Sequence, residues 1–426
     1  MSPRRPLIIA VTVLSAACRT AESVPASGAT PDAGRLQRDI AWLADDRREG
    51  RATGTAGNDS AAAWMARRHA TLGLRPLAPD GYLQRFVARS AQMAHSGSPG
   101  GATTQNVVAL VPGRDQTLRG EYVVIGAHFD HLGRSAASAM DPAAKDAIRN
   151  GADDNASGTA ALLELARLFA ARPARRSVIV AHFSGEELGL LGSQWFVDHP
   201  PVPLDSVVAM VNFDMIGRLR NDKLIVYGVA TARELSAIVD SANTAPRLVI
   251  SAVGDGFGPS DHSSFYAKGI PVLHFFTDLH DDYHRASDDV EKIDAAGAAR
   301  VVAVAERVVR TIADRPARLS PVRAAAPAPV AGGREGSNVY LGSIPDMSAA
   351  DTPGLRLSGV RAGSPADAAG LRGGDVIVEL GGRAVKDLYG YSEALYSRKP
   401  GDRVDIVFLR GGERKATSVT LSKRGQ

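Results

Sequence analysis

The sequence predicts an α/β protein with a doubly wound, mostly parallel sheet flanked by helices, followed by a small β-rich domain. Between residues 35 and 315, short apolar runs rich in β-branched residues alternate with longer stretches of helical periodicity. This alternation is typical of parallel strands that are joined by crossover helices. After a segment rich in Pro, Ala and Gly, residues 334–424 contain short strands and glycine turns instead.

The elements of the larger part follow one another in a regular order. Apolar residues at helical spacing predict a first helix over residues 35–45. Asn58 is expected to cap a second helix that ends at Gly73. The remaining predicted elements are four buried strands, at residues 121–127, 177–183, 207–213 and 269–276, and two helices, at residues 159–171 and 295–313.

Two imidazoles and three carboxylates along this part of the chain suit a pair of divalent metal ions. Most of them come just after predicted strands, where open α/β sheets place their binding sites. One carboxylate can bridge two metals, which leaves a further glutamate, Glu186, free to act as a base. The five candidate ligands are His128, Asp154, Glu187, Asp214 and His284.

Each of these residues has a commoner structural role when it is considered alone. A Glu-Glu pair is usually a solvated turn, and a run such as Asp153-Asp154-Asn155 is usually a turn or a helix cap. In this order and at strand ends, the set favours a two-metal hydrolase. Six further histidines are interpreted as structural or as support for the site; they are His131, His182, His199, His262, His274 and His280.

Over residues 35–315 the chain resembles the co-catalytic di-zinc aminopeptidases of metallopeptidase clan MH, the relatives of bacterial leucine aminopeptidase and of aminopeptidases S and Y. The resemblance is carried by several motifs. They are Arg48-Glu49-Gly50-Arg51, Gly126-Ala127-His128-Phe129-Asp130, Gly151-Ala152-Asp153-Asp154-Asn155, Ser184-Gly185-Glu186-Glu187, Val211-Asn212-Phe213-Asp214, Ser260-Asp261-His262 and Asp282-Tyr283-His284.

The resemblance implies two zinc ions per chain and a role for each motif residue. Asp154 would bridge the ions, and the peptide bond after it would be cis. One ion would be completed by His128 and Asp214, and the other by Glu187 and His284.

Three further residues are assigned to catalysis. The resemblance implies that Glu186 is the general base and that Tyr283 donates a hydrogen bond to the oxyanion, as a tyrosine does there in some relatives. Asp130, two residues after His128, is placed to accept the second N–H of that imidazole and fix its orientation.

The C-terminal residues 334–424 resemble a PDZ domain of the bacterial protease type. The signature consists of Gly363-Ser364-Pro365-Ala366, Ala369-Gly370-Leu371 and Gly373-Gly374-Asp375-Val376-Ile377. In such domains the N–H groups of one loop hold the terminal carboxylate of a peptide, which adds as a strand to the sheet edge. The matching loop residues here are Tyr340, Leu341, Gly342 and Ser343, which implies binding of peptide or protein C-termini.

The function implied is removal of N-terminal residues from peptides by a zinc metallopeptidase. Another exopeptidase, or a single-zinc aminoacyl cyclase on the same fold, is the first alternative. Cyclases lose part of the ligand set, whereas all five ligands are present here. Pro259 stands where some relatives carry an arginine, which puts an arginine-based substrate contact in doubt. A further alternative is a catalytically dead scaffold whose PDZ domain binds partners.

The N-terminus predicts export. A basic Arg4-Arg5 pair precedes an apolar stretch and then Ser15-Ala16-Ala17-Cys18, which resembles a bacterial lipoprotein signal. The alternative is an ordinary secretory peptide cleaved near Ala17. The apolar stretch is too short to span a membrane, so membrane contact is expected only through a lipid anchor, and the protein is expected in the periplasm, on the outer membrane or secreted. The expected divisions are signal 1–18, tether 19–34, peptidase 35–315, linker 316–333 and PDZ domain 334–424.

Charge and cysteine content exclude other classes of function. The formal net charge is +4 over 426 residues, and the basic residues are scattered, so no nucleic-acid-binding stripe is present. Cys18 is the single cysteine, which excludes disulfides within the chain and a cysteine-based metal site.

Overall fold

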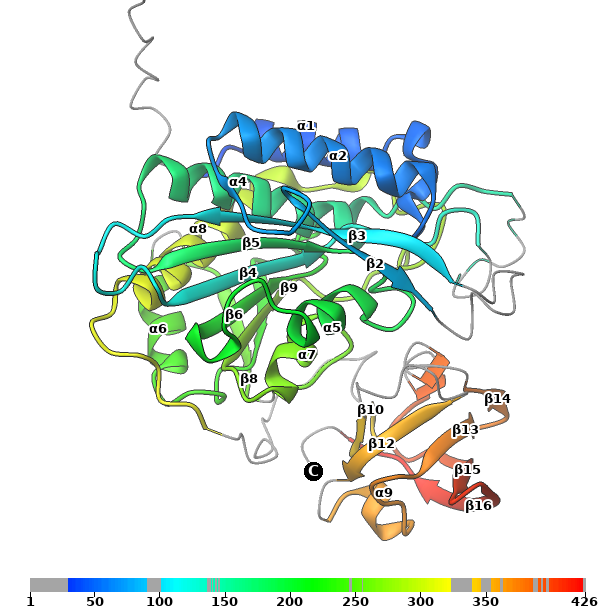
Figure 1. The fold of residues 1–426 in the computed structure, drawn as a ribbon. Helices are drawn as coiled ribbons and strands as arrows, with labels where there is room; N and C mark the ends of the chain where they lie inside the picture. Colours follow the sequence, from blue (N-terminus) through cyan, green and yellow to red (C-terminus); the bar gives the residue numbers. More distant parts are fainter. Residues whose placement is uncertain are drawn as a thin grey trace, which may run out of the picture.

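The computed structural model describes two folded parts (Figure 1). The residues described are 30–89, 101–135, 139, 141, 144, 146–244, 247–254, 256–322, 339–345, 354–360, 363–385, 390–391, 394–395 and 398–423. The predicted signal with Cys18, most of the tether and most of the linker lie outside these residues. Within the described ranges, no helix combines the length and apolar character needed to cross a bilayer.

A nine-stranded mixed sheet forms the centre of the larger part. Its order is β1-β3-β5-β4-β6-β9-β7-β8, with β2 paired to β3. The four central strands β5, β4, β6 and β9 are mutually parallel, whereas β3 pairs antiparallel with β5, and β7 with β9. The strands are β1 Arg75–Pro76, β2 Leu83–Ala88, β3 Ala102–Val111, β4 Tyr122–His128, β5 Ser177–Phe183, β6 Val207–Phe213, β7 Lys223–Tyr227, β8 Val249–Val253 and β9 Val272–Phe276.

The central strands are buried because apolar side chains leave both faces of the sheet. In β4, Val123 and Ile125 belong to the apolar core on one face, while Val124 between them belongs to the core on the other. Residues Val178 and Ile179 of β5 divide in the same way. Strands covered on both faces read as continuous apolar runs, and these are the four strands that the sequence predicts.

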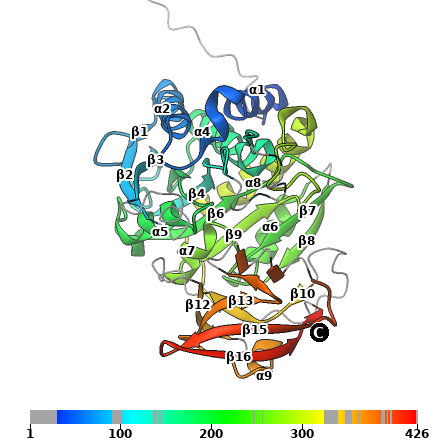
Figure 2. The same cartoon turned by 90° about the vertical axis from the view of Figure 1, so that its right-hand side faces the viewer.

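Helices cover the two faces of the sheet (Figures 1 and 2). Helices α1, α2, α4 and α8 lie over one face, and α5 and α7 over the other. The helices are α1 Ala33–Leu43, α2 Ala56–Thr71, α4 Gly158–Ala171, α5 Leu191–Asp198, α6 Leu235–Ala242, α7 His262–Ala267 and α8 Ala295–Asp314. The predicted helices over 35–45, 159–171 and 295–313 correspond to α1, α4 and α8 and are confirmed.

The structure corrects two element boundaries. Helix α2 is capped by Thr55, whose hydroxyl accepts a hydrogen bond from the N–H of Asn58, so Asn58 lies inside the helix. Its buried amide instead donates to the carbonyl of Arg51. Strand β9 begins at Val272 and not at Gly269, because Gly269 has a φ of +81° and the intervening Pro271 lacks an N–H donor.

The C-terminal part is a small β-rich domain with its own apolar core. Its larger sheet has the order β11-β12-β13-β15-β16, with β14 paired to β13, and β10 pairs separately with β17. Leu190 of the larger part belongs to the same apolar cluster as this core. The elements are β10 Val339–Tyr340, β11 Ser343–Pro345, β12 Leu355–Val360, α9 Pro365–Ala368, β13 Val376–Leu380, β14 Arg383–Ala384, β15 Arg403–Arg410, β16 Glu413–Thr420 and β17 Ser422–Lys423.

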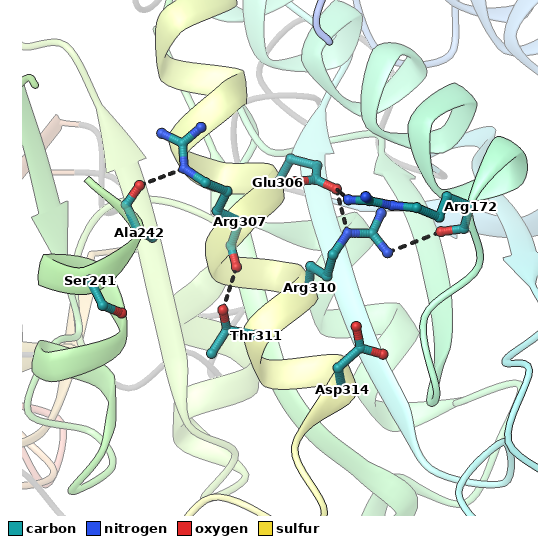
Figure 3. A pocket seen from close by; sticks show the side chains of 8 residues that line it. All are labelled: Arg172, Ser241, Ala242, Glu306, Arg307, Arg310, Thr311 and Asp314. Atoms are coloured by element: carbon teal, nitrogen blue, oxygen red, sulfur yellow. Dashed lines mark hydrogen bonds and ion pairs between the residues drawn. The ribbon is translucent and has the colours of Figure 1, made fainter. Parts of the chain in front are cut away.

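A pocket of about 320 Å³ lies against helix α8 (Figure 3). Inside it, the carboxylate of Glu306 accepts hydrogen bonds from Arg310 and from Arg172. The charges of Glu306, Arg310 and Arg172 are therefore paired with one another. None of the residues predicted for the metal centre lines this pocket; it is lined by Arg172, Ser241, Ala242, Glu306, Arg307, Arg310, Thr311 and Asp314.

Candidate metal centre

The candidate ligands meet at the carboxyl ends of neighbouring parallel strands. His128 is the last residue of β4, and Asp214 directly follows β6, which pairs with β4. Glu187 lies just beyond β5 on the other side of β4. Asp154 comes from a short kinked helical segment, η3 Ala152–Ser157, directly before α4, and His284 comes from the loop after β9. The fold thus brings five residues, separated by up to 156 positions, into one buried cluster. Each of these residues is at most 9 % exposed.

Asp154 lies between the two imidazoles. Its Oδ1 is 3.3 Å from His128 Nε2, and its Oδ2 is 3.2 Å from His284 Nε2. Asp214 Oδ1 lies 3.5 Å from the same nitrogen of His128. Glu187 Oε2 lies 3.3 Å from the same nitrogen of His284. Each half of the site therefore contains one imidazole and one carboxylate, and the two halves share Asp154.

Two carboxylate oxygens of this cluster lack hydrogen-bond partners in the described part of the chain. They are Glu187 Oε2 and Asp214 Oδ1, and both are buried. A buried carboxylate without a donor is energetically costly, and a divalent cation satisfies such oxygens directly. Imidazole nitrogen together with carboxylate oxygen is a donor set that zinc accepts. The residues present therefore fit a pair of zinc ions.

Other side chains lie close enough to be ligands themselves. Potential donor atoms of His128, Glu186 and Asp214 lie within 4.8 Å of one another, and so do those of His131, Asp154 and Glu187. His131 Nδ1 is 2.7 Å from Glu187 Oε1. His131 is expected to be structural or to support the site, and its position agrees with support of Glu187. The sequence feature that indicates this role is the position of His131, three residues after His128.

Asp130 has a different hydrogen-bond pattern from the one expected. The Nδ1 atom of His128 is 3.2 Å from the backbone carbonyl of Asp130 and 3.7 Å from its carboxylate. The carboxylate instead accepts the backbone N–H of Glu186 at 3.2 Å and the hydroxyl of Thr53 at 2.8 Å. Asp130 therefore orients His128 through its main chain and the Glu186 loop through its side chain.

Backbone N–H groups anchor the segment that carries Asp154. The carboxylate of Asp288 accepts the N–H groups of Asp153 and Asp154, both at 3.0 Å. Asp153 in turn accepts the N–H of Gly217 and contacts His280 Nε2 at 3.1 Å. The peptide bond between Asp154 and Asn155 is cis, as the resemblance implied.

The candidate ligand Asp214 also has a partner that orients it. The hydroxyl of Ser260 donates to Asp214 Oδ2 at 2.7 Å, and the amide of Asn212 donates to Ser260 at 2.8 Å. In the sequence, Ser260-Asp261-His262 is only one of the motifs that carry the resemblance, and nothing there assigns Ser260 to a ligand. Asp288 likewise has no predicted role, although it follows His284 by four positions.

The environment drives the pKa values of the two adjacent glutamates apart. Burial, reinforced by Glu187 and Asp214, raises the pKa of the Glu186 carboxyl well above its usual value, although His128 opposes the shift. Burial is the largest single influence on Glu187 and would raise its pKa, but the charges of His284 and His131, together with the hydrogen bond from His131, lower this pKa to about 2. Opposite shifts in neighbouring carboxyl groups separate a proton-carrying group from a permanently ionised one. Glu186 therefore suits the base and Glu187 the ligand.

Tyr283 lies at the edge of the cluster. Its ring stacks on the ring of His284, with centroids 3.9 Å apart. Burial and the carboxylates, led by Asp154, raise the pKa of the phenol well above its ordinary value. The hydroxyl therefore stays protonated and is available as a hydrogen-bond donor.

Comparison with known proteins agrees with this geometry. Residues 106–309 match the family described as peptidase family M28, and residues 339–421 match the PDZ domain. Residues 106–309 thus form an M28 peptidase domain. The C-terminal part is a PDZ domain, and the M28 family is the co-catalytic zinc family of clan MH that the sequence motifs resemble.

Individual relatives of the M28 domain carry peptidase names. The chain is 27 % identical over 201 residues to aminopeptidase YwaD of Bacillus subtilis, a match that covers 45 % of this chain and 41 % of that protein. The chain therefore spans less than half of the length of this relative. Among solved structures, the zinc aminopeptidase BSAP of Bacillus subtilis has a TM-score of 0.56 at 17 % identity, with 67 % of this chain and 96 % of that chain covered.

A glutaminyl cyclase shares the fold as well. The structure of the Bacteroides thetaiotaomicron enzyme has a TM-score of 0.53 at 17 % identity, covering 66 % of this chain and 98 % of that chain. Likeness at this identity shows the fold alone. The choice between peptidase and cyclase therefore depends on the site residues.

The loop expected to bind a peptide carboxylate lies at the start of the PDZ sheet. Gly342 has a φ of +86°, between β10 and β11. Strand β11 is at the end of the strand order, and among the described residues it pairs only with β12. Ser343 at its start exchanges a hydrogen bond with the hydroxyl of Tyr391. A left-handed glycine before an edge strand is a backbone arrangement to which a peptide strand can be added.

Proposed function

We propose that the protein is a di-zinc aminopeptidase that removes N-terminal residues from peptides. The observation that carries this proposal is the position of Asp154, whose two oxygens lie 3.3 and 3.2 Å from the imidazoles of two different half-sites. A carboxylate shared in this way is what a pair of metal ions requires. The relatives named as aminopeptidases and zinc metalloproteases support the same activity.

The ligands divide between two ions. His128, Asp214 and Asp154 would hold one zinc, and Glu187, His284 and Asp154 the other. Zinc supplies Lewis acidity toward the substrate carbonyl and lowers the pKa of a water molecule to about 7. His131 would orient the carboxylate of Glu187, and Ser260 that of Asp214, through the hydrogen bonds described above.

Glu186 carries the proton in the proposed reaction. Its raised pKa suits a group that takes a proton from the attacking water and passes it to the leaving amine. Asp130 fixes the backbone of Glu186 by accepting its N–H. Tyr283, whose hydroxyl stays protonated, is the candidate donor to the oxygen of the scissile carbonyl. The products are a free amino acid and a peptide shorter by one residue.

The alternatives have less support. A single-zinc cyclase needs only one half-site, yet the residues of both are present: His128 and Asp214 beside one oxygen of Asp154, and Glu187 and His284 beside the other. A catalytically dead scaffold does not need Glu186, which is also present and 3 % exposed. The complete constellation therefore favours the aminopeptidase.

A panel of aminoacyl-p-nitroanilides tests this proposal, assayed with metal-depleted and with zinc-restored protein. We expect hydrolysis that disappears on metal removal and returns with zinc. N-acetylated versions of the same substrates serve as the control, because an aminopeptidase requires the free amine. Equal turnover of the blocked substrates, or cyclisation of N-terminal glutamine without hydrolysis, would contradict the aminopeptidase assignment.

We propose that the chain is exported and, through Cys18, anchored by lipid. The basic start, the apolar stretch and the single cysteine support this proposal. Mass spectrometry of the mature N-terminus after expression in a bacterial host tests it. A lipid-modified N-terminal cysteine is expected, and cleavage near Ala17 without modification would show secretion instead.

We propose that the PDZ domain holds polypeptide substrates or an envelope partner by the C-terminus. A truncation after Val322 keeps residues 318–322, which bond the larger part, and should therefore leave turnover of dipeptide-sized substrates intact while it reduces turnover of long peptides. This cut exposes Leu190, which is 1 % exposed in the full chain, and it keeps Leu319, which is buried in the core of the larger part. Exposing one leucine costs roughly 1.5–3 kcal/mol of stability, which is less than the total for a domain of this size.

The control for this truncation is the full-length protein with an added competitor peptide that carries a free C-terminus. The competitor should slow the hydrolysis of long peptides and leave small-substrate turnover unchanged. If the truncated protein loses small-substrate turnover together with its fold, the PDZ domain is structural and the recruitment proposal is wrong.

A further inference from the structure

We infer that Arg51 is a positioning residue that holds the metal-binding segments in place before the metals bind. Its side chain is fully buried, with 0 % exposure. Its guanidinium donates to four backbone carbonyls. The Nε atom donates to Phe129 at 2.7 Å, Nη1 to Leu43 at 2.6 Å and to Asn150 at 2.8 Å, and Nη2 to Gly151 at 3.0 Å. This inference rests on the proposed zinc centre.

The four carbonyls belong to three segments that meet behind the site. Phe129 directly follows the ligand His128. Asn150 and Gly151 begin the loop that leads to the bridging Asp154. Leu43 ends helix α1. One side chain therefore ties the segments of two ligands to each other and to a helix that packs on the core.

An arginine suits this position for geometric reasons. The guanidinium is planar and presents five N–H donors in a fixed fork. A lysine ammonium at the same place has three donors on a single atom and does not reach carbonyls on opposite sides. The buried carbonyls of Phe129, Asn150 and Gly151 would then lose partners, at a cost for each unsatisfied group.

The positive charge of Arg51 also interacts with the carboxylates of the candidate metal centre. Burial lowers the pKa of its guanidinium to about 10, while Asp130, Asp154 and Asp288 act in the opposite direction. The side chain is therefore a permanent cation at neutral pH, beside several buried carboxylates. It offsets part of their mutual repulsion while the zinc positions are empty, which keeps the ligand loops together.

The local sequence holds Arg51 in an uncommon backbone conformation. Glu49, Gly50 and Arg51 have φ values of 46°, 64° and 52°. A Cβ on Gly50 would lie 2.1 Å from the carbonyl oxygen of Arg149, so only glycine fits there. The amide of Asn58 donates to the carbonyl of Arg51 at 3.1 Å. Three features of the sequence thus converge on placing this one side chain.

The test is the zinc affinity of Arg51→Lys, measured by competition with a chromophoric chelator and without reference to activity. We expect affinity to fall about 10- to 100-fold, the range for removing groups that orient metal ligands. The matched control is Arg176→Lys. Arg176 is also buried, at 1 % exposure, and it bonds Glu121 and the carbonyl of Arg315 at the opposite end of the strands. This control should keep wild-type zinc affinity.

The outcomes separate this inference from the proposed function. If the wild-type chain binds no zinc, the proposed function fails. If it binds zinc and Arg51→Lys binds it equally well in a folded state, the positioning role is wrong and Arg51 is only structural. If Arg51→Lys does not fold, Asn58→Ala removes the support of Arg51 while retaining its guanidinium. A zinc affinity of folded Asn58→Ala equal to that of the wild type and of Arg176→Lys would then overturn the inference.

Discussion

Glu186→Gln should lower kcat by roughly 10²–10⁴, the range for the loss of a general base. The substitution keeps the size of the side chain but removes its ability to take and return a proton. Glu186 has no ligand role in the proposed assignment, and its pKa is raised by burial and by Glu187. We therefore expect zinc content and KM to change little, so that the defect appears in turnover.

Glu187→Gln is the matched comparison, because it makes the same chemical change at the next residue. This variant should lose zinc from one half-site, since the carboxylate beside His284 would be replaced by an amide. Elemental analysis together with steady-state kinetics separates the two effects. If Glu186→Gln loses zinc and Glu187→Gln retains it, the two roles have been exchanged in our assignment.

Asp154→Asn should have the largest effect on metal binding. An amide has only one oxygen that can bind a metal ion, because its NH2 group is a hydrogen-bond donor. It is therefore unable to serve both half-sites as the two carboxylate oxygens do. We expect tight binding at both positions to be lost and hydrolysis to fall to background. Asp214→Asn alters only the half-site of His128 and should leave the other zinc in place. Zinc measured after dialysis against buffer checks both variants. Retention of both ions by Asp154→Asn would show that this residue does not bridge.

The central strands were predictable because burial on both faces gives continuous apolar runs, as in Val123-Val124-Ile125 of β4. The edge strands carried no such signal. Strand β8 is largely exposed, with Val249 at 59 % exposure, and β2 alternates between buried and exposed residues. Such strands are fixed by pairing with a neighbour, which a single sequence does not reveal.

The cluster of candidate ligands was predictable from the motifs, but the groups that orient these residues were not. Asp130 was expected to serve His128 with its carboxylate, yet the carbonyl of the same residue is closer. The partners of Arg51 are all backbone carbonyls, which have no residue-specific signature in the sequence. Hydrogen bonds of this kind depend on where the main chain passes in three dimensions.

The number of zinc ions that the chain binds tests the central claim most directly. Metal-free protein should be titrated with zinc, and bound metal should be counted by elemental analysis while hydrolysis of an aminoacyl-p-nitroanilide is followed in the same samples. The shared position of Asp154 predicts two ions per chain, with full activity reached only when both positions are filled. One ion per chain at saturation, or none, would contradict the two-metal account.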